Sequence, residues 1–162
     1  MTLTDLNTAL NSFDGRFAKF MPFIFQAECV FGNGGQIIVE EEDGDDGGAT
    51  FAGLDSASHP NLKFSNMSPQ DVCQVYFNEW QANKISEYSV PFGECFQDFA
   101  INAGVGRALK TLQISGPDAA AFNNARRAFY NRLAAQKPVL AKFLRGWLNR
   151  VDNLEKFLGL KG

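Results

Sequence analysis

Apolar side chains that recur every three or four residues constrain this chain more than any other feature of its sequence. Such spacing places them on one face of an α-helix, and that face must then pack against other elements. The widest stripe follows Pro138, and Gly159 marks the end of the helix that carries it. We therefore expect a long helix with one face in the core. The stripe consists of Val139, Leu140, Phe143, Leu144, Trp147, Leu148, Val151 and Leu154.

A second stripe lies near the start of the chain and is rich in phenylalanine. Pro22 falls inside it. Proline removes a hydrogen bond from a helix interior, so we expect the helix to break or restart there and to run to about Val30. Phenylalanines at this spacing belong to a core far more often than to a ligand site. The residues of the stripe are Phe13, Phe17, Phe20 and Ile24.

Start and stop signals indicate further helices. Ser68 followed by Pro69 predicts a helix start, with the serine as the N-cap and the proline at the first helical position. Another helix is expected from Pro91 to Gly104, where the glycine suits a left-handed cap. Residues 31–55 lack the helical spacing of these segments. They contain turn glycines, a short β-type run and an acidic run, which indicate strands and loops.

These elements predict a mainly α fold of the α+β class. We expect a helical bundle body at residues 68–158, a small β-hairpin or loop insert at 31–55 that flanks a cleft, and an N-terminal arm at 1–12 that is either a short helix or a loose segment. A length of 162 residues suits one domain, so a single domain over residues 1–162 is predicted. The hydrophobic content of 45% can bury a core, which excludes intrinsic disorder as the main state.

Composition argues against several kinds of site. The longest apolar run, residues 20–25, is far shorter than the roughly 20 residues of a membrane span, so no span is expected. One histidine, His59, and three scattered cysteines do not suit a zinc site or a disulfide scaffold, and we expect no metal and no organic cofactor. The first residues lack a basic segment followed by an apolar one, so no secretory signal peptide is expected.

Charge is distributed unevenly along the chain. Residues 1–100 hold 4 basic and 15 acidic side chains, whereas residues 101–162 hold 11 basic and 3 acidic ones. The two parts could attract each other, with the remaining charges solvated. Alternatively, the basic part could contact an anionic envelope polymer, and binding would then weaken with salt. The side chains considered for such contact are Arg126, Arg127, Arg132, Lys142, Arg145 and Arg150.

Two acidic features could carry chemistry. Glu28 lies near the end of the phenylalanine-rich helix, where an apolar pocket would keep its carboxyl protonated, as a general acid requires. Otherwise it is a surface residue of an amphipathic helix. The acidic run at 40–46 could supply the second carboxylate of a glycosidase pair. It could instead bind calcium, although its spacing is not that of an EF-hand, or form a solvated loop tip.

The order of these features resembles a known family. Residues 17–28 look like its aromatic-rich helix ending in a glutamate, and residues 45–50 look like its Asp-Pro-Gly-Gly-x-Thr segment. Gly53-Leu54 resembles its Gly-Ile pair. Residues 96–108 resemble its Phe-Asp-x-Ala-Val-Asn-x-Gly-x-Gly-x-Ala run, and residues 143–151 resemble its ending. The family is that of phage and prophage N-acetylmuramidases of the glycoside hydrolase 108 type with a C-terminal predicted peptidoglycan domain, within the lysozyme-like superfamily.

The resemblance covers roughly residues 13–157 and implies a peptidoglycan hydrolase. Glu28 would protonate the β-1,4 glycosidic oxygen between N-acetylmuramic acid and N-acetylglucosamine. Asp45 or Asp46 would orient a water or stabilise oxocarbenium-like charge, and Thr50 would help to hold that water. The residues expected to bind the substrate are Asn102, Trp80 and Tyr76.

Departures from the family keep two other functions open. Cys29-Val30-Phe31 follow Glu28 where the family has Gly-Gly-Tyr, which motivates a non-catalytic peptidoglycan-binding or virion structural protein on the same fold. A lytic transglycosylase would need one acid and no second carboxylate. A lysin of this kind is expected in the host cytoplasm until it reaches the wall or periplasm through a holin, or else in the virion. We expect a monomer that binds peptidoglycan and no nucleic acid.

Overall fold

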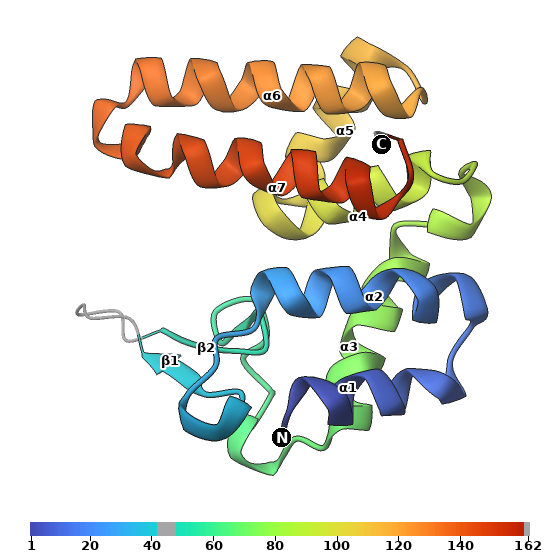
Figure 1. Ribbon diagram of the computed structural model, residues 1–162, viewed down its shortest axis with the longest axis vertical. Helices are drawn as coiled ribbons and strands as arrows, with labels where there is room; N and C mark the ends of the chain where they lie inside the picture. Colours follow the sequence, from blue (N-terminus) through green and yellow to red (C-terminus); the bar gives the residue numbers. More distant parts are fainter. Residues whose placement is uncertain (42–47, 161–162) are drawn as a thin grey trace. The chain divides into compact units, whose positions relative to one another are not determined.

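The computed structural model describes residues 1–41 and 48–160 and divides into two compact units, Met1–Glu79 and Trp80–Gly162 (Figure 1). Each unit is described by itself. Within the described residues the chain forms seven α-helices and one three-stranded antiparallel sheet. This confirms the mainly α fold with a small β insert. The single domain over residues 1–162 stays a prediction.

The first unit opens with helix α1 (Leu3–Ala9), which the 3-10 turn η1 (Leu10–Ser12) follows. Thr2 and Asp5 form a capping box at its start, so each satisfies a backbone N–H that the helix leaves open. Leu6 and Leu10 are buried. The segment expected as an arm is therefore a short helix anchored by two apolar side chains.

Helix α2 (Gly15–Glu28) begins after Asp14, whose carboxylate accepts hydrogen bonds from the backbone N–H groups of Arg16 and Phe17. The predicted break at Pro22 is wrong, because α2 continues through this residue and ends at Glu28. An interior proline costs about 3 kcal/mol. Buried apolar side chains on both sides of it contribute about 1.5–3 kcal/mol each, which outweighs that cost. These side chains are Phe17, Phe20, Ile24 and Phe25.

The β insert of this unit is a small antiparallel sheet. Strands β1 (Val39–Glu41), β2 (Ala49–Phe51) and β3 (Leu54–Asp55) pair in that order. Strands β2 and β3 are joined by Ala52 and Gly53 alone, which have φ angles of 52° and 81°. Two consecutive positive φ angles are the backbone pattern of the tightest β-hairpin turns.

Helix α3 (Pro69–Ala82) starts where the sequence predicts. The Ser68 hydroxyl accepts a hydrogen bond from the Asp71 N–H at 3.1 Å, and the Asp71 carboxylate accepts one from the Ser68 N–H at 2.8 Å. The 3-10 turns η2 (Asn33–Gly35) and η3 (Phe64–Asn66) lie in the connections of this unit. Phe77 of α3 packs edge-on against Phe17 of α2, with ring centroids 5.0 Å apart.

The second unit is helical in all its described elements: η4 (Ile85–Glu87), α4 (Phe92–Ala103), α5 (Val105–Ser115), α6 (Ala119–Gln136), η5 (Pro138–Phe143) and α7 (Leu144–Phe157). Every residue of α4 from 92 to 100 is buried. Gly104 ends α4, as its sequence position indicates, but its φ of 90° and ψ of 147° are not those of the left-handed cap that we expected. The helix expected from Pro138 is wrong in its first part, where a 3-10 helix precedes α7 and most of its side chains are exposed.

Candidate functional site

The carboxyl-terminal end of α2 brings Glu28 against the turn between β2 and β3. Glu28 is half-buried. A Cβ placed on Gly53 would lie 2.6 Å from the Glu28 Cβ and would also overlap the Tyr76 hydroxyl. No side chain fits at that position, and the φ of 81° independently favours glycine. The Gly-Ile-like pair of the sequence therefore lies where the turn backbone meets the predicted acid.

Tyr76 supports the same turn through a hydrogen bond from its hydroxyl and is fixed by the packing of its ring. Its hydroxyl donates a hydrogen bond to the carbonyl oxygen of Ala52 at 2.8 Å. Its ring meets Phe25 edge-on at 5.7 Å, and the side chain is 1% exposed. In this position the side chain supports the hairpin turn and does not present an aromatic face for a sugar.

Thr50 lies in the middle strand of the sheet, between two carboxylates. The strand register places Glu40 of β1 and Asp55 of β3 directly opposite Thr50. Directly opposite residues of antiparallel strands share one face of a sheet. Sequence reasoning missed Asp55, because an isolated aspartate outside the acidic run carries no spacing signal. Asp45 and Asp46, the predicted second carboxylates, lie outside the described residues.

A polar cluster continues from Asp55. The Asp55 carboxylate accepts a hydrogen bond from the Ser58 N–H at 2.7 Å, and this bond is the main reason why the pKa of Asp55 is lowered. The His59 ring lies 3.1 Å from the Asp55 carbonyl oxygen through Nδ1 and 3.2 Å from Glu79 Oε1 through Nε2. Burial raises the pKa of Glu79, and the charge and hydrogen bond of His59 oppose that rise. The only histidine thus links the end of β3 to α3.

The three cysteines do not offer a nucleophile. Cys29, Cys73 and Cys95 are buried free thiols. Burial raises the pKa of Cys29 to about 12, and the neighbouring Glu28 charge adds to that rise. Burial likewise raises the pKa of Cys73 to about 11 and that of Cys95 to about 12. All three are therefore protonated near neutral pH, and the thiol is the unreactive form.

The remaining predicted substrate residues belong to the second unit. Trp80 is 3% exposed, so its indole is packed inside the protein. Asn102 is half-buried near the end of α4, and its Oδ1 accepts a hydrogen bond from the Tyr130 hydroxyl. This bond makes Asn102 the edge of a polar network.

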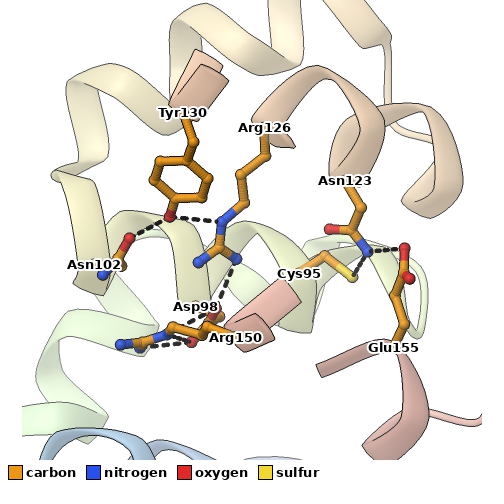
Figure 2. Close-up of polar contacts among 8 residues, drawn as sticks. All are labelled: Cys95, Asp98, Asn102, Asn123, Arg126, Tyr130, Arg150 and Glu155. Carbon is orange, nitrogen blue, oxygen red and sulfur yellow. Dashed lines mark hydrogen bonds and ion pairs between the residues drawn. The ribbon is translucent and has the colours of Figure 1, made fainter. Parts of the chain in front are cut away.

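Asp98 of α4 is the centre of that network (Figure 2). Its side chain is fully buried and accepts hydrogen bonds from Arg126 Nη1 at 2.6 Å and Arg150 Nη2 at 2.7 Å. Arg126 Nε also donates to the Tyr130 oxygen at 3.0 Å. Burial alone would raise the pKa of Asp98, but the two guanidinium groups outweigh it and lower the pKa. One buried carboxylate thereby joins α4, α6 and α7.

A second group of contacts fastens α6 to α7. Arg127 donates to Glu155 Oε2 and to Asp152 Oδ1, each at 2.6 Å. The Asn123 amide contacts both the Cys95 sulfur and Glu155 Oε1 (Figure 2). Three of the six arginines and lysines considered for anionic polymers are consequently engaged within the unit, and Arg126 is fully buried. The prediction is wrong for Arg126, which is fully buried, and stays a prediction for Arg127 and Arg150, whose side chains are 19% and 13% exposed.

The comparison with protein families places a match in this unit. The family model described as "Predicted Peptidoglycan domain" matches residues 106–152, from α5 into α7. The match relates the chain to peptidoglycan. It covers less than a third of the chain and includes Arg126 and Arg150. Because the match stops before the last residues, the domain is not at the C-terminus as predicted. Neither the curated proteins nor the solved structures contain a match to this chain.

Over residues 1–41 and 48–160, no helix has the length and apolarity to cross a membrane. The same part of the chain contains no group of three or more histidine, cysteine, aspartate or glutamate side chains arranged to hold a metal ion.

Proposed function

We propose that the protein is a peptidoglycan hydrolase of the N-acetylmuramidase type, with Glu28 as its general acid. The observation that carries this proposal is the contact between Glu28 and Gly53, which holds the aliphatic part of a half-buried glutamate against a β-hairpin turn. A general acid must reach the substrate oxygen, and a half-buried side chain at the end of a helix leaves that access open. The peptidoglycan match at residues 106–152 supports the substrate class.

In the proposed reaction, Glu28 donates its proton to the bridging oxygen as the bond from that oxygen to the anomeric carbon of N-acetylmuramic acid breaks. The N-acetylglucosamine part leaves as an alcohol. A water oxygen bonds to the anomeric carbon, and its proton passes to the second carboxylate. The net change is the addition of one water across one glycosidic bond.

Three aspartates are candidates for the second carboxylate. Asp45 or Asp46 remains the prediction from the sequence, and Asp55 is a further candidate because it lies opposite Thr50. The Ser58 hydrogen bond keeps the Asp55 pKa low, so Asp55 is ionised near neutral pH, as a base or charge stabiliser must be. Thr50 would help to hold the water between strand and substrate.

Digestion of purified sacculi tests this function. The wild type should release muropeptides with reducing N-acetylmuramic acid ends, detected by mass spectrometry, and Glu28→Gln should release none while remaining folded by circular dichroism. Glu87→Gln is the matched control, because Glu87 is an exposed glutamate of the second unit. Full activity of Glu28→Gln would remove Glu28 from the mechanism. Anhydro ends from the wild type would instead identify a lytic transglycosylase.

A second candidate function is peptidoglycan binding without cleavage, as in a wall-binding or virion structural protein. The position of the family match favours it, because residues 106–152 exclude Glu28, Thr50 and the whole sheet. Sedimentation of the wild type with sacculi, without any released fragment, would establish this function. For the hydrolase we propose a phage or prophage origin, with release from the host cytoplasm through a holin or delivery in the virion.

A further inference from the structure

The connection between α6 and α7 and the helix ends that it joins form a basic tip. The basic tip is defined here as Arg132, Lys137, Lys142 and Arg145 with the apolar residues Val139 and Phe143. Figure 1 shows α6 and α7 side by side, joined by η5. The four basic side chains are exposed. No aspartate or glutamate occurs in the sequence from residue 119 to residue 151, so this end of the helix pair has one sign of charge.

The described acids near these helices are already engaged elsewhere. Asp98 binds Arg126 and Arg150, and both Asp152 and Glu155 bind Arg127. Asp118 caps the far end of α6, where its carboxylate accepts a hydrogen bond from the Ala121 N–H. None of the ion pairs among the described residues involves a basic side chain of the tip.

The stability of α7 does not explain this charge. The amino-terminal end of a helix carries partial positive charge, so cations there are unfavourable and acids are favourable. Arg145 is the second residue of α7, Lys142 lies two residues before its start, and its first turn contains no acid. The placement of Lys142 and Arg145 therefore costs stability, which points to a role of these two cations in contact with another molecule, whereas Lys137, the C-cap of α6, is favourably placed.

Apolar side chains at the tip indicate the kind of molecule. Val139 is 74% exposed and Phe143 is 47% exposed. The Lys142 ammonium group lies 5.0 Å from the centroid of the Phe143 ring. Exposed apolar side chains surrounded by lysine and arginine are typical of surfaces that enter the headgroup layer of a bilayer, where the apolar groups leave water and the cations meet phosphates.

We propose that the basic tip docks on a bilayer surface that carries anionic lipid, with Val139 and Phe143 entering the headgroup layer. The four basic side chains would contact headgroup phosphates. This inference goes beyond the proposed hydrolase, because it uses none of the residues near Glu28 and requires no bond cleavage. It concerns contact with one face of a membrane and no span.

Sedimentation of the full chain with vesicles tests the charge contribution. Vesicles containing phosphatidylglycerol should bind the protein, and pure phosphatidylcholine vesicles should not. The double substitution Lys137→Gln with Lys142→Gln should weaken binding by roughly twentyfold or more, since each basic side chain near such a surface contributes roughly fivefold. Lys110→Gln with Lys156→Gln removes the same charge from exposed positions outside the tip and should change binding much less.

A second pair of variants tests the apolar contribution. Val139→Ser and Ile114→Ser each replace an apolar side chain of equal exposure, 74% and 75%. Only Val139→Ser should weaken vesicle binding, by roughly five- to tenfold, because only Val139 belongs to the tip. Binding should also fall as sodium chloride rises from 0.05 to 0.5 M, as the Debye length shrinks.

Three results would overturn the proposal: equal binding to phosphatidylcholine vesicles, equal losses in the tip and control variants, or no binding to vesicles of any composition. If the tip residues are instead required for sedimentation with sacculi while vesicles remain unbound, the tip is a wall-binding surface and the membrane proposal is wrong. None of these results depends on whether Glu28 is catalytic.

Discussion

Gly53 lies so close to Glu28 that a Cβ on the glycine would come within 2.6 Å of the glutamate Cβ. The hairpin turn and the end of α2 are thus fitted to each other at one position where both conformation and space require glycine. The backbone of the β insert therefore positions the predicted acid. Substitutions in the turn should shift the position of the Glu28 side chain while leaving its carboxyl group in place as a functional group.

Gly53→Ala should lower the free energy of unfolding of the first unit by about 2–4 kcal/mol. A positive φ costs an alanine about 1 kcal/mol, and overpacking against Glu28 and Tyr76 adds about 1–3 kcal/mol. Urea denaturation provides the measurement. Gly34→Ala is the matched control, because Gly34 also has a positive φ, of 73°, but has no atom within 4 Å of its added Cβ. Equal losses in the two variants would show that the contact contributes nothing.

Tyr76→Phe should lower the free energy of unfolding by about 1–2 kcal/mol, because it leaves the carbonyl oxygen of Ala52 without its 2.8 Å hydrogen bond. The packing of the ring against Phe25 should persist. Amide hydrogen exchange should be faster at Ala52 and Gly53 than in the wild type. Unchanged exchange at the turn would contradict the support that we assign to the hydroxyl.

Asp98→Asn should destabilise the second unit by about 3–5 kcal/mol, since it leaves Arg126 buried without a compensating charge. Asp152→Asn is the control. Asp152 also binds an arginine at 2.6 Å, but its side chain is 51% exposed, so its loss should cost about 1 kcal/mol or less. Chemical denaturation followed by tryptophan fluorescence compares the two. Similar losses would mean that burial does not set the strength of this pair.

The same carboxylate predicts a dependence on pH. The folded pKa of Asp98 is lowered below its ordinary value of 3.8, so its stabilising contribution is fully present above that value and is lost as the pH falls through the lowered folded pKa. The free energy of unfolding should therefore fall below about pH 4, and Asp98→Asn should flatten this decline. An identical acid slope in the two proteins would assign acid unfolding to other groups.

The active-site hypothesis predicts different effects for the candidate second carboxylates. If Asp55 is the second carboxylate, Asp55→Asn should lower the rate of sacculus hydrolysis by at least about a hundredfold, whereas Asp45→Asn and Asp46→Asn should each retain activity. The reverse pattern would favour the acidic run. Because Asp55 also binds the Ser58 N–H, circular dichroism must show that Asp55→Asn remains folded.

The elements that the sequence predicted well are those in which local signals agree. Ser68 and Asp71 cap α3, and Gly104 ends α4, as their positions indicate. Pro22 misled the prediction because a local rule was overridden by burial on both sides of it. The same limit applies after Pro138, where the first apolar residues of the stripe are largely exposed and the chain forms a 3-10 helix.

The candidate site was partly predictable. Glu28 and Gly53 lie far apart in the sequence, and only the resemblance suggested that both belong to one site. Asp98 was missed, although an acid flanked by Phe96 and Phe99 is a signal of a buried ion pair. Its partners could not be found, because Arg126 and Arg150 are two of many basic residues and only packing selects them.

The folded structure shields its three free cysteines from reagents in solution. With thiol pKa values of about 11 to 12, Cys29, Cys73 and Cys95 should resist alkylation until the structure around them opens. Two of them report on the first unit and one reports on the second. Mass spectrometry of iodoacetamide-treated protein can therefore time the opening of each unit separately, with no label introduced.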